Sequence, residues 1–439
     1  MITENHKTMI DVLKQKGVVG DGNHDDTVGL QAALDSGATT VSLPCPLRNY
    51  LISKTLRIHS GQTMLADRNA VIRLADHAHA HMLTNADHEQ GNKNISVIGG
   101  IWDGNNEHQT CEYHQTGKWQ VPYDPVRYLG EIMQFNNVTD LRVAGLTLKD
   151  PEAFGFAAGN LRRFTVEDIT FDYNLRRNNM DGIHIHGNSH QGRIVNLKGT
   201  TNDDFVALCA DDGSMFELSR GPITDILVDG LWSEDSFSGV RLLSAGSPVQ
   251  RIKISNIFGA FRAHAVAFTN HAVHPGEAST FDDISIDGMF CRKPEKCYGS
   301  VQSPDSPSCP YGRQCWQLCK HVSVQAPDGD GPESIHSGSL SLVLIQAPAI
   351  ISNLSIRDYH RTETAMPADD IHIQPGAYVD NLLLDGMTVS NRSGNPIIML
   401  HNCGKIENLG LQHVRAITGG SVVDIIKNEG TIGHIERTN

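Results

Sequence analysis

Leu141-Arg142-Val143, followed by Gly145-Leu146, is a short pattern that returns many times along the chain. In each copy two apolar residues flank a third residue, which is the alternation of a strand with one buried face. An Asn, Asp or Gly stands where the chain has to turn. The later copies are Phe164-Thr165-Val166, Ile226-Leu227-Val228, Ile252-Lys253-Ile254, Ile284-Ser285-Ile286, Leu354-Ser355-Ile356, Leu382-Leu383-Leu384 and Leu409-Gly410-Leu411.

The spacing of these copies decides the fold. Intervals between the last residues of neighbouring copies include 23, 26, 27, 28 and 32 residues. Stacked parallel strands require such a period, because each rung buries its apolar face against the next. A leucine-rich horseshoe has a similar period, but its asparagine ladder and regular leucines are missing from this sequence. The pattern therefore predicts an all-β protein, a single-stranded right-handed parallel β-helix that forms one domain over residues 1–439.

The N-terminal region predicts a capping helix. Acidic residues and a threonine between Asp21 and Thr27 precede an amphipathic run with Val28, Leu30 and Leu34, which ends at Gly37. A cap is expected there because an uncovered terminal rung exposes an unpaired strand edge and the apolar interior.

The cysteines point to an insertion between coils. Five of the nine lie between Cys291 and Cys319, in a stretch rich in Pro, Gly and Ser, so we predict a cysteine-rich loop at about residues 291–331. Cys315 and Cys319 have a spacing found in structural zinc sites, but no CxxC is present. A loop with free thiols, or with one or two disulfides, is favoured over a metal knot.

Charge and hydropathy exclude several partners. The chain has 36 Lys and Arg against 50 Asp and Glu, a formal net charge of −14, and no basic run that would follow a phosphate backbone. No segment is apolar enough to span a membrane. Residues Met1 to Lys16 lack the apolar segment of a secretory signal. We therefore expect no nucleic-acid or membrane partner and a cytoplasmic location, or secretion if a leader has been removed.

Three aspartates stand out by their spacing. Asp181 precedes Gly182 in one motif, and Asp203 and Asp204 lie together about one coil later. Neighbouring rungs are roughly 5 Å apart, so the three carboxylates should converge. The alternative is that each aspartate bonds backbone amides at its own corner, as we expect for Asp229 and Asp385.

Convergence would suit acid/base catalysis. Like charges repel and burial penalises ionisation, so at least one of the three should have a raised pKa. A protonated carboxyl group can then protonate a departing glycosidic oxygen, while an ionised partner deprotonates water.

These motifs resemble those of the polygalacturonases, glycoside hydrolase family 28, within the pectin-lyase-like β-helix superfamily. Asn179-Met180-Asp181-Gly182-Ile183-His184 is similar to the family's Asn-Thr-Asp-Gly-x-Asp, and Asn202-Asp203-Asp204-Phe205-Val206-Ala207-Leu208 is similar to its Asp-Asp-Cys-Ile-Ala element. The resemblance implies a β-helix from about residue 18 onward. It also implies that Asp203 is the general acid, that Asp181 and Asp204 hold the attacking water, and that the reaction inverts the anomeric centre without a metal or other cofactor.

Two departures from the family concern the substrate. Ser238 stands where the family's Gly-His-Gly has its histidine. The rhamnogalacturonan-cleaving branch of the family also lacks that histidine, so its absence is compatible with hydrolysis. Arg251-Ile252-Lys253 matches the family's carboxylate-binding Arg-Ile-Lys, but it lies about half a coil early, so its charged side chains should face solvent. The expected position, near Ala267 to His271, offers no cation. A neutral or differently charged glycoside is therefore expected, not classical polygalacturonate.

Further polar residues are candidates for substrate binding. Alternation places Ile183 and Ile185 inside, so His184 and His186 should line the outer surface, either as plain rung residues, as sugar contacts or as a metal-binding pair. Arg241 could contact substrate or pair with a neighbouring acid. The predicted substrate-binding residues are Asn179, His184, Arg241, His264 and His271. The aromatic residues that could stack on sugar rings are Trp102, Trp119, Tyr123 and Trp232.

The sequence thus predicts an inverting glycoside hydrolase that acts on a carbohydrate substrate, and a homo-oligomer is left open. Two other classes stay open. One is a non-catalytic carbohydrate-binding β-helix of the tail-fibre or adhesin type, and the other is a polysaccharide lyase, which needs a base near a uronate α-proton and commonly calcium.

Overall fold

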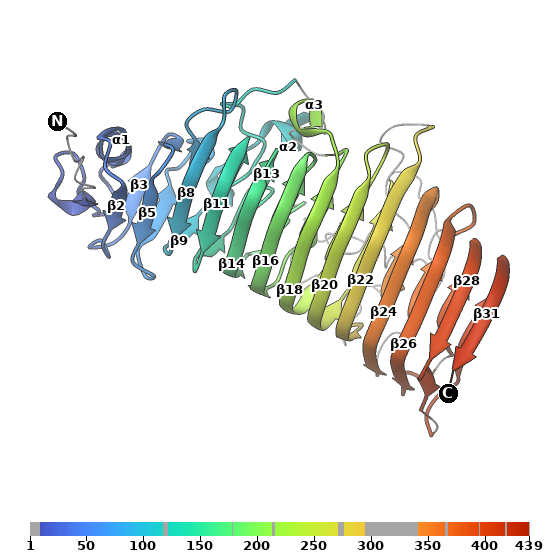
Figure 1. Cartoon of the computed structure of the whole chain (residues 1–439). Helices are drawn as coiled ribbons and strands as arrows, with labels where there is room; N and C mark the ends of the chain where they lie inside the picture. The colour runs from blue at the N-terminus through green and yellow to red at the C-terminus, as the bar shows by residue number, and fades with distance from the viewer. Residues whose placement is uncertain are drawn as a thin grey trace.

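A computed structural model describes residues 9–116, 122–177, 179–212, 216–270, 276–294, 341–364, 368–394, 396–417 and 419–438. They wind into a right-handed parallel β-helix with the two termini at opposite ends (Figure 1). Every strand pairing among them is parallel, as the repeat predicts.

The strands form two long sheets that run along the coil axis. The larger sheet contains β1 Met9–Asp11, β2 Thr40–Leu43, β3 Tyr50–Ile52, β5 Thr63–Ala66, β6 Val71–Leu74, β8 Asn92–Ile98, β9 Ile101–Asp103, β11 Val138–Ala144, β12 Thr147–Lys149, β14 Arg162–Asp172, β16 Ser189–Gly199, β18 Ile223–Ser236, β20 Val249–Phe261, β22 Ser279–Arg292, β24 Ala349–Glu363, β26 Tyr378–Asn391, β28 Lys405–Gln412, β29 Arg415–Ala416 and β31 Thr431–Thr438. The smaller sheet contains β4 Leu56–Ile58, β7 Leu83–Asn85, β10 Met133–Asn136, β13 Phe156–Gly159, β15 Ile183–His186, β17 Asp204–Cys209, β19 Ser238–Leu243, β21 Val266–Thr269, β23 Val343–Ile345, β25 Ile371–Ile373, β27 Ile397–Asn402 and β30 Val423–Asn428.

Register in the larger sheet confirms the predicted rungs and adds one between Val166 and Val228. Val166 is in register with Ile194, and Ile194 with Val228, so two coils lie between Val166 and Val228. The extra rung lacks the first apolar residue of the pattern because Gly192 stands there. A Cβ at Gly192 would meet the Phe164 ring of the preceding coil at 2.2 Å, so the phenylalanine fills the space of the missing side chain.

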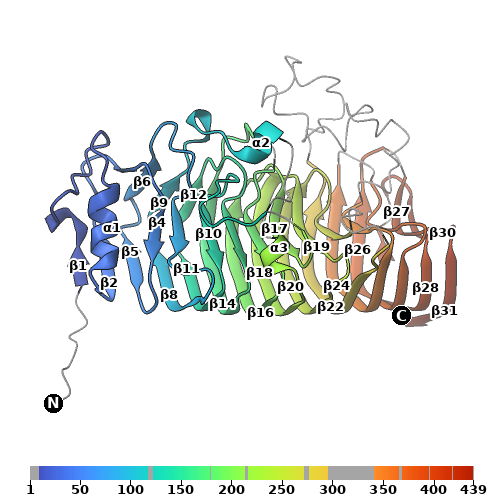
Figure 2. The same ribbon diagram turned by 90° about the horizontal axis from the view of Figure 1, so that it is seen from above.

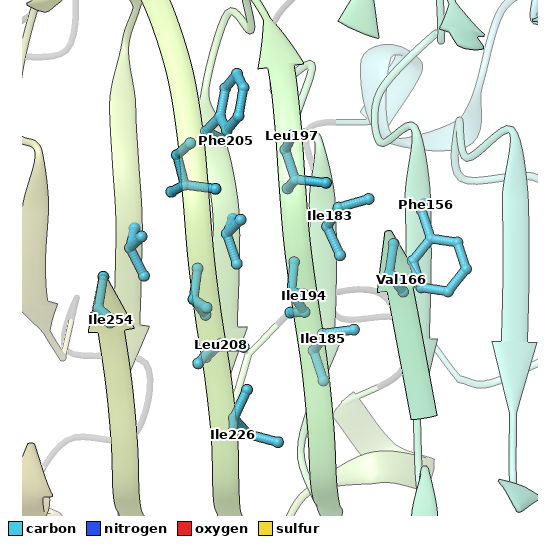
Figure 3. Packing of buried hydrophobic residues seen from close by; sticks show 14 of the residues in the cluster. Phe156, Val166, Ile183, Ile185, Ile194, Leu197, Phe205, Leu208, Ile226 and Ile254 are labelled. Carbon is cyan, nitrogen blue, oxygen red and sulfur yellow. The ribbon is translucent and has the colours of Figure 1, made fainter. Parts of the chain in front are cut away.

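The core lies between the two sheets. Inward side chains from successive coils stack in columns, as Ile185 and Leu208 do in Figure 3, where Ile183 and Phe205 are further members of the core. All four are fully buried. This close packing fixes which residues of each strand point outward, and so fixes the positions from which a site can be built.

A short helix covers the N-terminal coil, as predicted (Figure 2). α1 (Thr27–Asp35) buries Leu30 and Leu34, whereas Val28, expected on the same apolar face, is 79% exposed. Asp26 does not cap the helix with its side chain. Its buried carboxylate accepts hydrogen bonds from three backbone N–H groups outside the helix, and so fastens the entry loop.

The remaining helices lie in loops and are η1 Val12–Lys14, η2 Asn106–His108, α2 Glu112–Thr116 and α3 Phe216–Ser219. Among the described residues, none of the helices has the length and apolar character needed to cross a membrane.

The predicted cysteine-rich insertion begins later than expected. Cys291 belongs to β22, where its buried free thiol donates to the backbone oxygen of Ile257 (3.5 Å). The strand runs to Arg292, and the next described strand is β23. The other four cysteines, namely Cys297, Cys309, Cys315 and Cys319, lie outside the described residues.

Candidate active site

Consecutive coils of the smaller sheet bring the acidic motifs together. Ile183 of β15 is in register with Val206 of β17, which is in register with Val240 of β19. Asp181 and Asp204 precede Ile183 and Val206 by the same two residues, and the N–H of Gly182 donates to the backbone oxygen of Asp204 (2.9 Å). The inward isoleucine and valine side chains therefore set the positions of both aspartates.

Three aspartates meet at this point on the outer face. One carboxylate oxygen from each of Asp181, Asp203 and Asp204 lies within 4.8 Å of the other two. Asp181 and Asp204 are only 1% and 2% exposed, whereas Asp203 is half-buried. The predicted convergence is thus what the structure has, with Asp203 nearest to solvent.

Asp181 has the strongest reason to keep a proton. Burial raises its pKa well above the ordinary value, and the neighbouring charges of Asp203 and Asp204 raise the pKa further. Its Oδ2 is hydrogen-bonded to Nδ1 of His184 (2.7 Å). Burial also lowers the pKa of His184 well below its usual range, so the imidazole is neutral.

Asp204 is held by a cation and a hydroxyl. Nε of Arg241 lies 2.5 Å from Asp204 Oδ2, and the Ser238 side chain hydrogen-bonds the same carboxyl group. Burial raises the pKa of Asp204, whereas Arg241 and Ser238 lower the pKa. Arg241 also lies 3.7 Å from the Asp212 carboxylate. The ion pair with a neighbouring acid that was considered for Arg241 is therefore present.

The two outward histidines are buried, contrary to the expectation that they line the surface. Ile183 and Ile185 do point inward, so the alternation was predicted correctly. His184, however, stacks between Phe154 (centroids 4.5 Å apart) and His186 (4.5 Å). Nδ1 of His186 is hydrogen-bonded to the backbone oxygen of Asp212 (2.9 Å), and burial lowers the pKa of His186 to about 4.

Of the other predicted binding residues, His264 is the one that the described structure places apart from the acidic cluster. His264 is buried, with Nδ1 hydrogen-bonded to the backbone oxygen of Ser341 (2.7 Å), and it lies two coils beyond Asp204, roughly 10 Å along the axis. Asn179 is half-buried in the turn before Asp181, with a left-handed φ of 56° that suits asparagine. His271 lies outside the described residues.

The Arg-Ile-Lys string faces solvent, as expected. Arg251 forms an exposed ion pair with Asp225 (2.6 Å), while Ile252 is buried in the core. In the register of the smaller sheet, Ala267 follows Arg241. The position expected to bind a substrate carboxylate is therefore apolar.

Corner aspartates away from the site act differently from the prediction. Asp229 accepts hydrogen bonds from Ser255 (2.6 Å) and Asn256 (2.8 Å) on the next coil. Asp385 likewise bonds His413 of the next coil (3.1 Å). Side chains one coil away thus replace the local amides that we expected as partners.

The candidate stacking residues divide by location. Trp102 is a core residue, and Trp232 is 44% exposed on the larger sheet, where it stacks on Phe258 (5.8 Å). Trp119 lies outside the described residues. Tyr123 is hydrogen-bonded to His88, and both line a pocket of about 380 Å³.

This pocket, which we call the N-terminal pocket, opens on the same face as the acidic cluster. Its lining residue Thr84 is in register with Gln134, then Ala157, then His184. It therefore lies three coils, or roughly 14 Å, before His184 along the axis. Its lining residues include Arg57, Asn85, Asp87 and Glu89.

Sequence reasoning missed two residues that shape the site. Asp212 approaches Arg241 and accepts from His186, and Phe154 covers His184. The acidic pair Asp211-Asp212 directly after a buried strand was a usable signal for the first. Phe154 carried none, because its position depends on the turn before β13.

The fold and the cluster define a class, a parallel β-helix protein that gathers three carboxylates on the outer face of one sheet. The family model for glycosyl hydrolases family 28 matches residues 88–216, a segment that contains all three aspartates. The predicted resemblance to this family is therefore confirmed over these residues.

Solved structures agree on the fold. The A-module of the mannuronan C-5 epimerase AlgE6 from Azotobacter vinelandii is 12% identical and has a TM-score of 0.53, with 98% of this chain and 99% of that chain covered. The endo-xylogalacturonan hydrolase from Aspergillus tubingensis is 13% identical with a TM-score of 0.50, and 94% and 100% are covered. Gene product 12 of bacteriophage phi29 is 14% identical with a TM-score of 0.54, and 96% and 57% are covered.

A search of curated proteins found no match for this sequence. The family match and the fold support a carbohydrate-active enzyme or binder, and a carbohydrate ligand fits both.

Proposed function

We propose that the protein is a glycoside hydrolase that cleaves an O-glycosidic bond with inversion at the anomeric carbon. The observation that carries this proposal is the meeting of three carboxyl groups from neighbouring coils within 4.8 Å, two of them buried and one half-buried. Burial and mutual repulsion keep the cluster from full ionisation, so it can both give and take a proton.

In the proposed reaction Asp203 protonates the departing glycosidic oxygen. Asp181 and Asp204 hold a water molecule, whose oxygen attacks the anomeric carbon as the carbon–oxygen bond breaks. The water gives up its proton to Asp204, whose ionised form Arg241 favours, so the cluster ends with the number of protons with which it started. Because the three groups interact strongly, the protons belong to the cluster as a whole and not to one residue.

The distances between the three carboxyl groups bear on whether the reaction inverts or retains the anomeric configuration. Inverting glycosidases commonly separate their two carboxyl groups by about 6.5–9.5 Å and retaining ones by about 5–5.5 Å. The closest oxygens here are nearer than either. Asp181 is held by His184, and Asp204 by Arg241 and Ser238. Buried and anchored in this way, neither can reach a sugar carbon as a nucleophile, whereas a small water molecule can reach both.

The charges around the cluster favour a substrate without a uronate at the cleavage site. Arg241 is committed to Asp204, and the next residue in its column is Ala267. A carboxylate placed there would meet three acidic groups, and among the described residues the nearest cation in this column, Arg241, is already paired with Asp204. The N-terminal pocket offers Arg57 and polar groups at a distance suited to a further sugar ring.

The test follows the first-formed product by NMR in a screen of aryl glycosides and oligosaccharides. We expect the inverted anomer, and retention would overturn the proposed mechanism. Asp203→Asn should abolish turnover while the thermal unfolding midpoint stays unchanged. Asp140→Asn is a matched control, because Asp140 pairs with Arg163 on the exposed face of the other sheet and should leave turnover intact.

The same screen separates the other classes. If the protein binds glycans but hydrolyses none of them, hydrolysis is contradicted and a carbohydrate binder is favoured. An unsaturated product that is lost on chelation would favour a polysaccharide lyase.

A further inference from the structure

A second cluster of reactive side chains lies near the C-terminal end of the smaller sheet. His372 on β25 is in register with His401 on β27, and Cys403 follows β27. One ligand atom from each of these three residues lies within 4.8 Å of the other two. Cys403 is a free thiol. Two imidazoles and a thiol therefore meet at one point on the outer face.

A carboxylate completes this group. Oε2 of Glu429, in the turn after β30, lies 3.1 Å from Nε2 of His401 and 3.5 Å from Sγ of Cys403. The four side chains are His372, His401, Cys403 and Glu429, which we call the C-terminal cluster. They come from three consecutive coils, so no single coil could form the cluster alone.

A further contact orients one of the histidines. Nδ1 of His401 is hydrogen-bonded to Oδ2 of the buried Asp369 (2.8 Å). Metal-binding histidines commonly have this arrangement, in which one ring N–H donates a hydrogen bond to a carboxylate and the other nitrogen binds the metal. Asp369 thus directs Nε2 of His401 toward Glu429 and Cys403.

We propose that the C-terminal cluster binds a divalent transition metal of the zinc class. Imidazole nitrogen, thiolate sulfur and carboxylate oxygen are all zinc ligands, and four of them match tetrahedral coordination. Zinc–ligand distances of about 2.0–2.3 Å require the ligand atoms to move closer than the 4.8 Å within which those of His372, His401 and Cys403 lie, and side-chain rotation can supply this movement. On binding, the thiol of Cys403 loses its proton to solvent, so that the thiolate and the Glu429 carboxylate balance the charge of the ion.

The neighbouring charges permit a cation. Asp369 and Glu429 are acidic, and the one ammonium group paired here among the described residues, that of Lys427, contacts Oε1 of Glu429 (2.8 Å). That contact leaves Oε2 directed to the cluster. Glu429 is about half exposed, so the ion has a path from solvent.

The position of the C-terminal cluster indicates a structural metal site and not a catalytic one. Ala207, on the strand of Asp204, is followed in register by Arg241, Ala267, Leu344 and His372, so the two clusters share one face but lie four coils, or roughly 19 Å, apart. The last coil is poorly buried, since β30 and β31 consist largely of exposed and half-buried residues. A metal bound to three coils would hold this loosely packed end together.

The experiment titrates the metal-free, reduced protein with Co²⁺ as a spectroscopic substitute for Zn²⁺. We expect one ion per cluster, a thiolate-to-cobalt charge-transfer band and the strong visible bands of four-coordinate cobalt. Cys403→Ser should remove the charge-transfer band. Asp369→Asn should weaken binding by about 10- to 100-fold and leave the spectrum at saturation unchanged, because Asp369 orients a ligand without being one.

Two control variants match the residue types. Cys45→Ser removes an exposed thiol and His413→Gln removes an exposed histidine, and both lie outside the cluster. Neither should alter the spectrum or the affinity. Cobalt bound by thiols elsewhere in the chain would persist in Cys403→Ser, so the difference between wild type and this variant reports the cluster alone.

A second measurement protects the test against misfolded variants. Zn²⁺ should raise the thermal midpoint of wild type and of both controls but not that of Cys403→Ser, whose metal-free midpoint should equal that of wild type. Identical cobalt spectra for wild type and Cys403→Ser, or only the weak bands of six-coordinate cobalt, would overturn the proposal.

Discussion

Replacing Arg241 by methionine tests the electrostatics of the acidic cluster most directly. The guanidinium lies 2.5 Å from Asp204, and the two side chains are 16% and 3% exposed, so water replaces little of a lost contact. Breaking a buried ion pair by removing one partner costs about 3–5 kcal/mol, because the other charge stays buried without compensation. We therefore expect Arg241→Met to lower the free energy of unfolding by about that amount near neutral pH.

The loss should depend on pH with a definite sign. Burial already raises the pKa of Asp204 above its unfolded value, and removing Arg241 raises the pKa further. An acid with a raised folded-state pKa contributes stability that is present at low pH and lost as the pH rises through that pKa. The deficit of Arg241→Met relative to wild type should therefore shrink as the pH falls, because Asp204 becomes protonated.

Urea unfolding of matched variants provides the assay. Arg251→Met is the control, since Arg251 and Asp225 form a similar pair that is 51% and 43% exposed, and such surface pairs contribute about 0–1 kcal/mol. Asp204→Asn combined with Arg241→Met should recover most of the loss. Equal losses for Arg241→Met and Arg251→Met, or a deficit that does not change with pH, would refute this reasoning.

Two further predictions concern stability. The pKa of His186 is about 4 in the folded state, below the usual 6.5, because the side chain is buried. Its neutral form therefore contributes stability above pH 6.5, and about 3 kcal/mol of this stability is lost as the pH falls toward 4. His186→Phe should flatten this part of the pH–stability curve, and an unchanged curve would contradict the assigned burial. Gly192→Ala should destabilise by about 1–3 kcal/mol because its Cβ would meet the Phe164 ring, whereas Gly410→Ala, whose Cβ would meet only the end of the Leu383 side chain at 3.1 Å, should stay near wild type in chemical unfolding.

The rungs could be predicted because one physical rule governs every coil. Each inward position must be apolar, so the pattern around Val143 repeats wherever a strand enters the stack. The rule failed at Gly192, where the side chain that fills the space belongs to Phe164, one coil earlier. A sequence pattern shows which side chain stands at a position, but it does not show that a side chain of a neighbouring coil fills the space there.

The acidic cluster could be predicted for the same reason, and its surroundings could not. The interval from Asp181 to Asp204 equals that from Ile183 to Val206, so the core register alone brings the carboxylates together. The burial of His184 depends on Phe154 and on the turn at Asp212, and turns do not follow the alternation of the strands. The sequence repeat of a β-helix therefore predicts which residues become neighbours more reliably than it predicts how exposed their side chains are to solvent.

This distinction bears directly on the chemistry. Alternation alone describes His184 as a surface residue, which would titrate near its usual pKa and give Asp181 a charged partner. Burial instead makes His184 neutral, so it offers Asp181 a hydrogen bond without a counter-charge. Asp204 has a cationic partner in Arg241, whereas Asp181 faces two other carboxyl groups and is hydrogen-bonded to a neutral imidazole. The resulting difference in pKa between two aspartates of adjacent coils is the property on which proton transfer at this site depends.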